Sequence, residues 1–197
     1  QVLCMKCFAS GKSGTILSLG CYSECLDSQD IKETETVVRG LLPLGNRIQL
    51  ATKQIVTEEF LEIIKQYRVY AEQMHVYISI PTISLISQLE PGTVSLNQRI
   101  INIENCIRYD VPVVLYIKPF LENITECDLE KYIKIVKKYR IPAVVGGYLY
   151  TEPNGKLADV GDGRLYESDL DLRRAKFINE LRKYTQVSEH STEKGLL

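Results

Sequence analysis

The sequence predicts an α/β protein built as a partial (β/α) barrel with mostly parallel strands. From residue 47 onward, short β-rich runs alternate with amphipathic helical segments. Two of the runs, 111–117 and 141–150, are almost continuously apolar, which is typical of strands buried on both faces of a parallel sheet. Only four such strands are visible, too few for a closed eight-stranded barrel, so we expect an open sheet.

The first two strands are predicted at 47–51 and 75–80. The helix after the first strand begins near Glu58 and Glu59, where the positive end of the helix dipole favours acidic side chains. The second strand carries β-branched residues at alternate positions, and Pro81 ends it. This strand–helix–strand order favours a parallel arrangement.

The later helices are predicted from their capping residues. Ser95 and Gln98 have the spacing of a capping box, as do Thr125 and Asp128, and each pair precedes an apolar stripe of helical period. A last amphipathic helix is predicted over 168–184. We therefore divide the chain into a cysteine-bearing loop region with the first helix (1–46), a β/α core (47–185) and a flexible C-terminal tail (186–197).

Composition narrows the functional classes. The net charge of −1 and the hydrophobic fraction of 45% are ordinary for a soluble globular protein. No apolar run approaches the roughly 20 residues that span a bilayer, so we expect no membrane partner. The near-zero charge disfavours a surface built for nucleic acid throughout. A cytoplasmic location is expected, because the cysteines cluster as metal ligands do rather than spreading through the chain as disulfide partners do.

Cysteines dominate the N-terminal region. Four of the six fall within the first 25 residues, and Cys4 and Cys7 form a C-x-x-C pair. Read on spacing alone, Cys4 and Cys7 with Cys21 and Cys25 indicate a structural zinc site with four thiolate ligands. Because the chain begins with Gln1, we also expect that residues precede it.

The middle of the chain resembles the radical S-adenosylmethionine (radical SAM) superfamily, most closely the spore photoproduct lyase-like branch. The resemblance covers about residues 47–150. It consists of a strand ending in Thr52-Lys53, a strand ending in Ser79, the segment Glu90-Pro91-Gly92-Thr93, an arginine (Arg99) that opens a helix, and a buried strand ending at Pro119. The segment from Glu90 to Arg99 is its most specific part.

The resemblance implies an enzyme that carries a [4Fe–4S] cluster on a C-x-x-x-C-x-x-C loop after the first strand. Cys4 and Cys7 are then the second and third cysteines of that motif. The first cysteine and the first strand of the sheet would precede Gln1. In such enzymes the cluster cleaves S-adenosylmethionine and generates a 5′-deoxyadenosyl radical, which abstracts a substrate hydrogen. An external electron donor is implied as well.

The resemblance also implies residues that bind S-adenosylmethionine. Lys53 would bind its carboxylate, and Ser79 its ribose or methionine moiety. Gly146 and Gly147 would let the adenine ring approach a buried strand. Each has an ordinary alternative: a solvated lysine, a serine hydroxyl bonded to local backbone, and two glycines that allow tight helix packing.

The substrate stays open. Repair of thymine dimers in DNA is possible but not favoured, because the basic residues are spread along helices and do not form one concentrated surface. The polar segment 151–169 is predicted to cover the pocket. A hydrogen donor could be Cys127, Tyr148 or Tyr150. The alternative to the enzyme is a zinc-stabilised α/β binding module without catalysis.

Overall fold

The computed structural model describes residues 4–20, 23–147 and 171–191. Within these residues, six strands follow one another across a single unclosed parallel sheet in chain order: β1 (Leu17–Leu19), β2 (Ile48–Thr52), β3 (Met74–Ser79), β4 (Val113–Ile117), β5 (Ala143–Val145) and β6 (Val187–Ser188). The predicted α/β class, with parallel strands in an open sheet, is confirmed.

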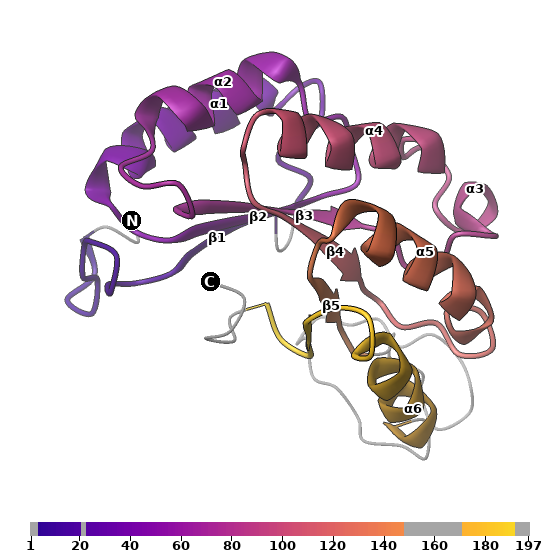
Figure 1. The fold of residues 1–197 in the computed structure, drawn as a ribbon. Coiled ribbons are helices and arrows are strands. Elements are labelled where there is room, and N and C mark those ends of the chain that lie inside the picture. Colours follow the sequence, from indigo (N-terminus) through magenta and orange to yellow (C-terminus); the bar gives the residue numbers. More distant parts are fainter. Residues whose placement is uncertain (1–3, 21–22, 148–170, 192–197) are drawn as a thin grey trace. The chain divides into compact units, whose positions relative to one another are not determined.

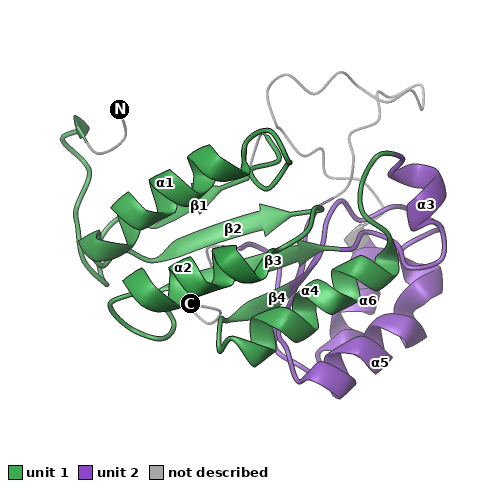
Figure 2. Ribbon diagram, turned by 90° about the horizontal axis from the view of Figure 1, so that it is seen from above, with its two compact units in different colours: residues 1–79, 92–114, 197 green, residues 80–91, 115–196 purple. Residues whose placement is uncertain are grey.

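The chain divides into two compact units (Figure 2). The first comprises residues 1–79, 92–114 and 197, and carries α1 (Ile31–Leu41), the 3-10 turn η2 (Leu42–Leu44), α2 (Glu58–Tyr67) and α4 (Leu96–Arg108). The second comprises residues 80–91 and 115–196, and carries α3 (Ile86–Leu89), the 3-10 turn η3 (Glu126–Asp128), α5 (Leu129–Tyr139) and α6 (Asp171–Leu181).

In the first unit, α1, α2 and α4 lie on the same side of β1, β2 and β3 (Figure 1). The strands pair in parallel with matched registers, so that Leu50 lies opposite Leu19 on one side and Val76 on the other. The core of this unit is aliphatic and fully buried, with Val38, Ile48, Leu50, Phe60, Leu61, Val76 and Ile103 at its centre. Burial of these side chains is the main favourable contribution to the unit's stability.

In the second unit, the core is built around aromatic side chains. Phe177 of α6 packs edge-to-face against Phe120 and Tyr132, with ring centroids 5.4 and 5.7 Å apart. The Tyr132 hydroxyl donates to the carbonyl of Ile80 at 2.9 Å, which satisfies the polar end of this buried ring. β4 begins in the first unit and ends in the second.

The predicted strands and helices are present, with boundaries shifted by a few residues. Ser95 caps α4 as predicted, because its hydroxyl accepts from the Gln98 N–H. Two strands are not among those predicted. β1 lies within the N-terminal region and pairs with β2. The first strand of the sheet was expected before Gln1, and β1 takes that position next to β2. β6 lies in the stretch predicted as a flexible tail and pairs with β5.

The predicted capping box of Thr125 and Asp128 does not form. The N-cap of α5 is Asp128, and its side chain makes no capping bond. The Thr125 hydroxyl instead donates to the Pro81 carbonyl at 2.7 Å. The Asp128 carboxylate is turned toward the loop after β3, where it accepts from the Thr82 hydroxyl at 2.8 Å and from two backbone N–H groups, those of Ile83 and Ser84. A tertiary contact has displaced the local cap.

Asp128 is therefore the residue that holds the loop after β3. Burial raises its pKa, but hydrogen bonds from the Ser84 hydroxyl and N–H, the Ile83 N–H and the Thr82 hydroxyl outweigh that effect and lower the pKa well below its ordinary value. A carboxylate whose pKa is lowered by folding stabilises the protein above its unfolded pKa of about 3.9, and this contribution is lost as the pH falls below that value.

We expect Asp128→Asn to lower the free energy of unfolding by about 1.5–3 kcal/mol at pH 7, because donors aimed at a carboxylate lose their charged acceptor. The difference from wild type should shrink when the pH falls below about 3.9. Urea denaturation at pH 7 and pH 3 measures both. Asp110→Asn is the matched control, since Asp110 is exposed and pairs with Arg68 at 3.1 Å on the surface. An equal, pH-independent effect in both variants would contradict this account.

Candidate functional site

The carboxyl ends of β2 and β3 form the centre of the candidate site. Lys53 directly follows β2, and Ser79 is the last residue of β3. The carboxyl ends of parallel strands are where α/β proteins bind ligands. The segment before α4 is bound to the first of these ends, because the Val94 N–H donates to the Lys53 carbonyl at 3.4 Å.

Arg99 completes this connection. Its guanidinium is fully buried and donates from Nε to the Val94 carbonyl at 3.2 Å and from Nη1 to the Ser79 carbonyl at 2.6 Å. Its Nη2 donates to the Thr93 hydroxyl at 2.6 Å. Lys53, Val94, Arg99 and Ser79 are thus linked by consecutive hydrogen bonds. The arginine singled out in the sequence is the group that fixes the two strand ends relative to each other.

Glu24, which the sequence did not single out, ties the loop after β1 to the same place. One carboxylate oxygen accepts from the Thr52 hydroxyl at 2.6 Å, and the other accepts from the Lys53 N–H at 2.8 Å. The Leu26 N–H also donates to this side chain, at 3.2 Å. A buried or half-buried carboxylate that accepts backbone N–H groups is a strong connection. The loop after β1 therefore lies at the carboxyl end of β2.

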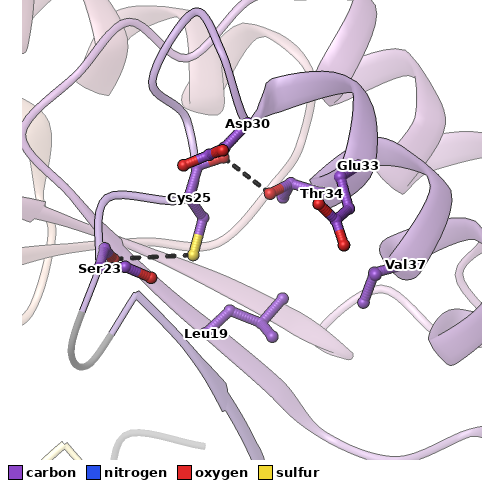
Figure 3. Close-up of a pocket in the computed structure, with 7 residues that line it drawn as sticks. All are labelled: Leu19, Ser23, Cys25, Asp30, Glu33, Thr34 and Val37. Carbon is purple, nitrogen blue, oxygen red and sulfur yellow. Dashed lines mark hydrogen bonds between the residues drawn. The ribbon is translucent and has the colours of Figure 1, made fainter.

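Cys25 lies in this loop and lines a pocket between it and α1. The pocket has a volume of about 330 Å³ and is lined by Leu19, Ser23, Cys25, Asp30, Glu33, Thr34 and Val37 (Figure 3). The Thr34 hydroxyl donates to the Cys25 carbonyl at 2.7 Å, which anchors the loop on α1. The Cys25 thiol points toward the Ser23 carbonyl, 4.0 Å away.

Cys4 and Cys7 do not lie with Lys53 and Ser79. Both thiols are exposed, and the chain that follows them is bound at the other end of β2. The Asn46 side-chain amide donates to the carbonyls of Ala9 and Thr15, at 2.7 and 2.8 Å. Asn46 precedes β2, and at about 3.3 Å per residue it lies about 20 Å from Thr52. The segment that follows Cys7 is therefore held near the amino end of β2, and the structure does not bring Cys7 together with Lys53 and Ser79.

The loop after β1 carries a cysteine spacing that the sequence reasoning missed. Cys25 follows Cys21 with three residues between them, and Ser28 follows Cys25 with two between. This is the C-x-x-x-C-x-x-C spacing with serine at the last position. Cys21 lies outside the described residues. The spacing is visible in the sequence, but only β1 places it directly after the first strand of the sheet.

Gly146 and Gly147 belong to the second unit, after the carboxyl end of β5. A Cβ on Gly146 would lie 2.6 Å from the side chain of Lys118, so the stem of that lysine occupies the space that the glycine leaves. The carbonyl of Gly146 accepts from Arg174 at 2.8 Å, and that of Gly147 accepts from the Phe120 N–H at 2.9 Å. These contacts favour the packing alternative for the glycine pair.

The predicted hydrogen donors and the predicted cover of the pocket lie elsewhere in the chain. Tyr148, Tyr150 and the segment 151–169 lie outside the described residues. Cys127 is exposed, and its thiol donates to the Asn123 carbonyl at 3.3 Å.

Within the part of the chain that the structure describes, no three His, Cys, Asp or Glu side chains are grouped in a way that could hold a metal ion. No helix there is both long and apolar enough to cross a membrane.

Solved structures share this fold. SuiB of Streptococcus suis, in a crystal structure bound to S-adenosylmethionine, matches with a TM-score of 0.62 and 13% identity, over 89% of this chain and 39% of that one. A spore photoproduct lyase double mutant with bound S-adenosylmethionine and dinucleoside spore photoproduct matches with a TM-score of 0.64 and 13% identity, over 88% of this chain and 60% of that one.

The chain has the fold of spore photoproduct lyase. It spans about 40 to 60% of the length of the matching structures, and at this identity the likeness concerns the fold. Spore photoproduct lyase complexed with dinucleoside spore photoproduct also matches, with a TM-score of 0.61 and 14% identity. No protein-family model and no curated protein matches the chain. The resemblance seen between residues 47 and 150 is therefore supported by structure rather than by close relatives.

We expect Arg99→Met to destabilise the first unit by about 2–4 kcal/mol, because it leaves the carbonyls of Ser79 and Val94 and the Thr93 hydroxyl without their buried donor. Arg108→Met, on the same helix, is the control. Arg108 is exposed and pairs with Glu58, so its loss should cost less than about 1 kcal/mol. Chemical denaturation of both variants measures the difference, and similar losses would show that the Arg99 bonds do not hold the strand ends.

Proposed function

We propose that this chain is the S-adenosylmethionine-binding part of a radical SAM enzyme. The observation that carries the proposal is the hydrogen-bonded connection of Lys53, Val94, Arg99 and Ser79, in a fold shared with structures solved with S-adenosylmethionine bound. It lies at the carboxyl ends of two neighbouring parallel strands, where α/β folds bind small molecules. The activity of the whole protein belongs to the proposal as well.

Lys53 and Ser79 have distinct roles in this proposal. The Lys53 ammonium pairs with the carboxylate of S-adenosylmethionine, and the Ser79 hydroxyl hydrogen-bonds its ribose or methionine moiety. Glu24 and Arg99 are positioning residues, because each acts by fixing the backbone beside one of these two side chains. Gly146 and Gly147 remain candidates for the approach of the adenine ring, although the Lys118 contact weakens the case for Gly146.

The loop after β1 supplies the cluster ligands in this proposal. Cys25 lies beside Glu24 at the strand ends, and Cys21 precedes it at the spacing of the radical SAM motif. Thiolates suit iron–sulfur clusters, and the serine hydroxyl at position 28 is a weaker ligand in the third place. The donor set fits a [4Fe–4S] cluster with two thiolates and one oxygen. Cys4 and Cys7 stay a competing prediction as metal ligands.

When bound, a [4Fe–4S] cluster supplies the electron that cleaves S-adenosylmethionine to a 5′-deoxyadenosyl radical, the species that abstracts hydrogen from a substrate. The residues of this chain bind the cofactor, orient it and exclude water. The electron comes from an external donor. The substrate is unassigned, and tight duplex DNA binding is not part of the proposal, because the chain's net charge is −1 and binding to duplex needs a concentrated basic surface.

The zinc-stabilised binding module is the second candidate, and the structure weakens it. A site with four thiolates requires all four sulfurs at one point. The segments that carry Cys7 and Cys25 are bound at opposite ends of β2, through Asn46 and Glu24 respectively. This arrangement favours the loop after β1 as a separate ligand set.

Anaerobic reconstitution with iron and sulfide, followed by visible absorption and iron analysis, tests the cluster. We expect Cys25→Ala to abolish the brown chromophore and Cys7→Ala to leave it unchanged, because only Cys25 lies at the strand ends. Ser28→Cys should raise the iron content and slow the loss of the chromophore, since it completes the three-thiolate set. One equivalent of zinc without a chromophore, or loss of the cluster in Cys7→Ala only, would overturn this assignment.

Calorimetry on the reconstituted protein tests Lys53. A charge-assisted hydrogen bond to a carboxylate contributes roughly 1.5–3 kcal/mol, so Lys53→Ala should weaken S-adenosylmethionine binding by about 10- to 150-fold. Lys65→Ala is the matched control, because Lys65 is an exposed lysine in the last turn of α2. Unchanged affinity in Lys53→Ala, with the cluster intact, removes Lys53 from the site.

A further inference from the structure

The amino-terminal edge of β2 and β3 collects buried polar atoms without hydrogen-bond partners. Among the described residues of the first unit, every buried side-chain nitrogen or oxygen that lacks a partner belongs to this edge: Asn46 Oδ1, Arg47 Nε, Gln49 Oε1, Tyr70 hydroxyl and His75 Nδ1. Gln49 and His75 are more than nine-tenths buried, with exposed fractions of 5% and 6%. Buried polar groups in folded proteins are nearly always paired, so this concentration requires an explanation.

These side chains lie close to one another. Gln49 of β2 is the register partner of His75 of β3, which puts both side chains side by side on the same face of the sheet. Arg47 precedes Gln49 by two positions, so strand alternation gives it the same face. Tyr70 joins them from the loop before β3, because its carbonyl accepts from the Gln73 N–H at 3.2 Å and the Gln73 side chain donates to the Asn46 carbonyl at 3.1 Å.

The donors and acceptors at this edge define what could bind there. The Arg47 guanidinium can only donate, and the Lys12 ammonium, 4.5 Å from the centre of the Tyr70 ring, adds a second positive charge. Gln49 Oε1 is a carbonyl oxygen and can only accept, and the amide nitrogen of Gln49 is already used, since it donates to the Ser18 hydroxyl at 2.7 Å. Burial lowers the pKa of His75, so its ring is neutral at pH 7. A ligand that matches this set has both an anionic acceptor and a donor.

We infer that the amino-terminal edge of β2 and β3 binds a small molecule that carries an oxyanion group next to a hydroxyl. The oxyanion accepts hydrogen bonds from Arg47 Nε and the Tyr70 hydroxyl, and the ligand hydroxyl donates to Gln49 Oε1. His75 Nδ1 lies beside Gln49 and makes a further contact. Asn46 is outside the site, because its amide nitrogen is turned to Ala9 and Thr15.

This site is separate from the strand ends that carry Lys53 and Ser79. Arg47 directly precedes β2 and Thr52 ends it, about 17 Å away along the strand. The inference is therefore independent of the proposed function, and a protein without a cluster would still bind this ligand. Phosphate esters and hydroxycarboxylates both carry an oxyanion and a hydroxyl. Titration with phosphate and with lactate distinguishes these two classes of ligand.

Inorganic phosphate, which at pH 7 carries both oxyanion and P–OH groups, is the first probe. Sulfate, which has no hydroxyl at that pH, is the second, and lactate represents the hydroxycarboxylates. Each is titrated calorimetrically into the full chain at ionic strength matched with sodium chloride. We expect phosphate or lactate to bind more tightly than sulfate. Whichever of phosphate and lactate binds more tightly shows whether the oxyanion is a phosphate or a carboxylate.

Variants then assign the contacts. Arg47→Met should weaken binding of the tighter probe at least about tenfold, and Tyr70→Phe about three- to tenfold, because each removes one donor to the oxyanion. Gln49→Met should remove the advantage of that probe over sulfate. Arg39→Met is the control for charge, since Arg39 is exposed on α1 and its loss changes the net charge equally. Tyr70→Phe keeps the ring and carries the test if Arg47→Met does not fold.

Equal affinity for all three probes, or equal weakening in Arg39→Met and Arg47→Met, would mean that the anions respond only to overall charge and would overturn the inference. Absence of any heat of binding would mean that the unpaired atoms are simply hydrated, which overturns it as well. Specific loss in Arg47→Met and Tyr70→Phe, with Arg39→Met unchanged, establishes the site.

Discussion

The buried guanidinium of Arg99 is the interaction on which the first unit depends. A charged group removed entirely from water is costly unless its donors are used, and here Nε, Nη1 and Nη2 all find acceptors. Two of these acceptors are backbone carbonyls, at Val94 and Ser79. One side chain therefore fixes the start of α4 and the end of β3 together. A lysine could not provide this geometry, because its ammonium lacks the planar fork.

The functional groups of the first unit fall into two sets, one at the carboxyl end of β2 and one at its amino end. Glu24 binds the carboxyl end and brings the loop with Cys25 beside Lys53. Asn46 binds the amino end and holds the segment that follows Cys7. Because parallel strands align all their carboxyl ends on one edge, a residue's distance along the chain says little about which end it serves. The segments that carry Cys7 and Cys25, close in sequence, are separated for this reason.

The loop with Cys25 connects the fold to the proposed function. Its backbone is bound on one side to β2 through Glu24 and on the other to α1 through the Thr34 hydroxyl, so the thiol is held at a defined position beside the strand ends. The proposed radical chemistry requires such fixed geometry, because its reactive groups must be positioned and shielded from water. Cys106, by contrast, is buried in the core, and burial raises the pKa of its thiol to about 12, which makes it inert.

The sequence by itself determined the parallel α/β class, the positions of β2 to β5 and the cap at Ser95, because hydrophobic period and capping depend on neighbours in the chain. It also singled out Lys53, Ser79 and Arg99 through a recognisable pattern. Only the tertiary structure decided which cysteines lie with them. β1 has three residues and little local signal, so its pairing with β2 was invisible, and with it the position of Cys25. The role of Asp128 was also decided by the tertiary structure. Its spacing from Thr125 predicted a helix cap, but its carboxylate accepts from the N–H groups of Ile83 and Ser84, which are distant in sequence.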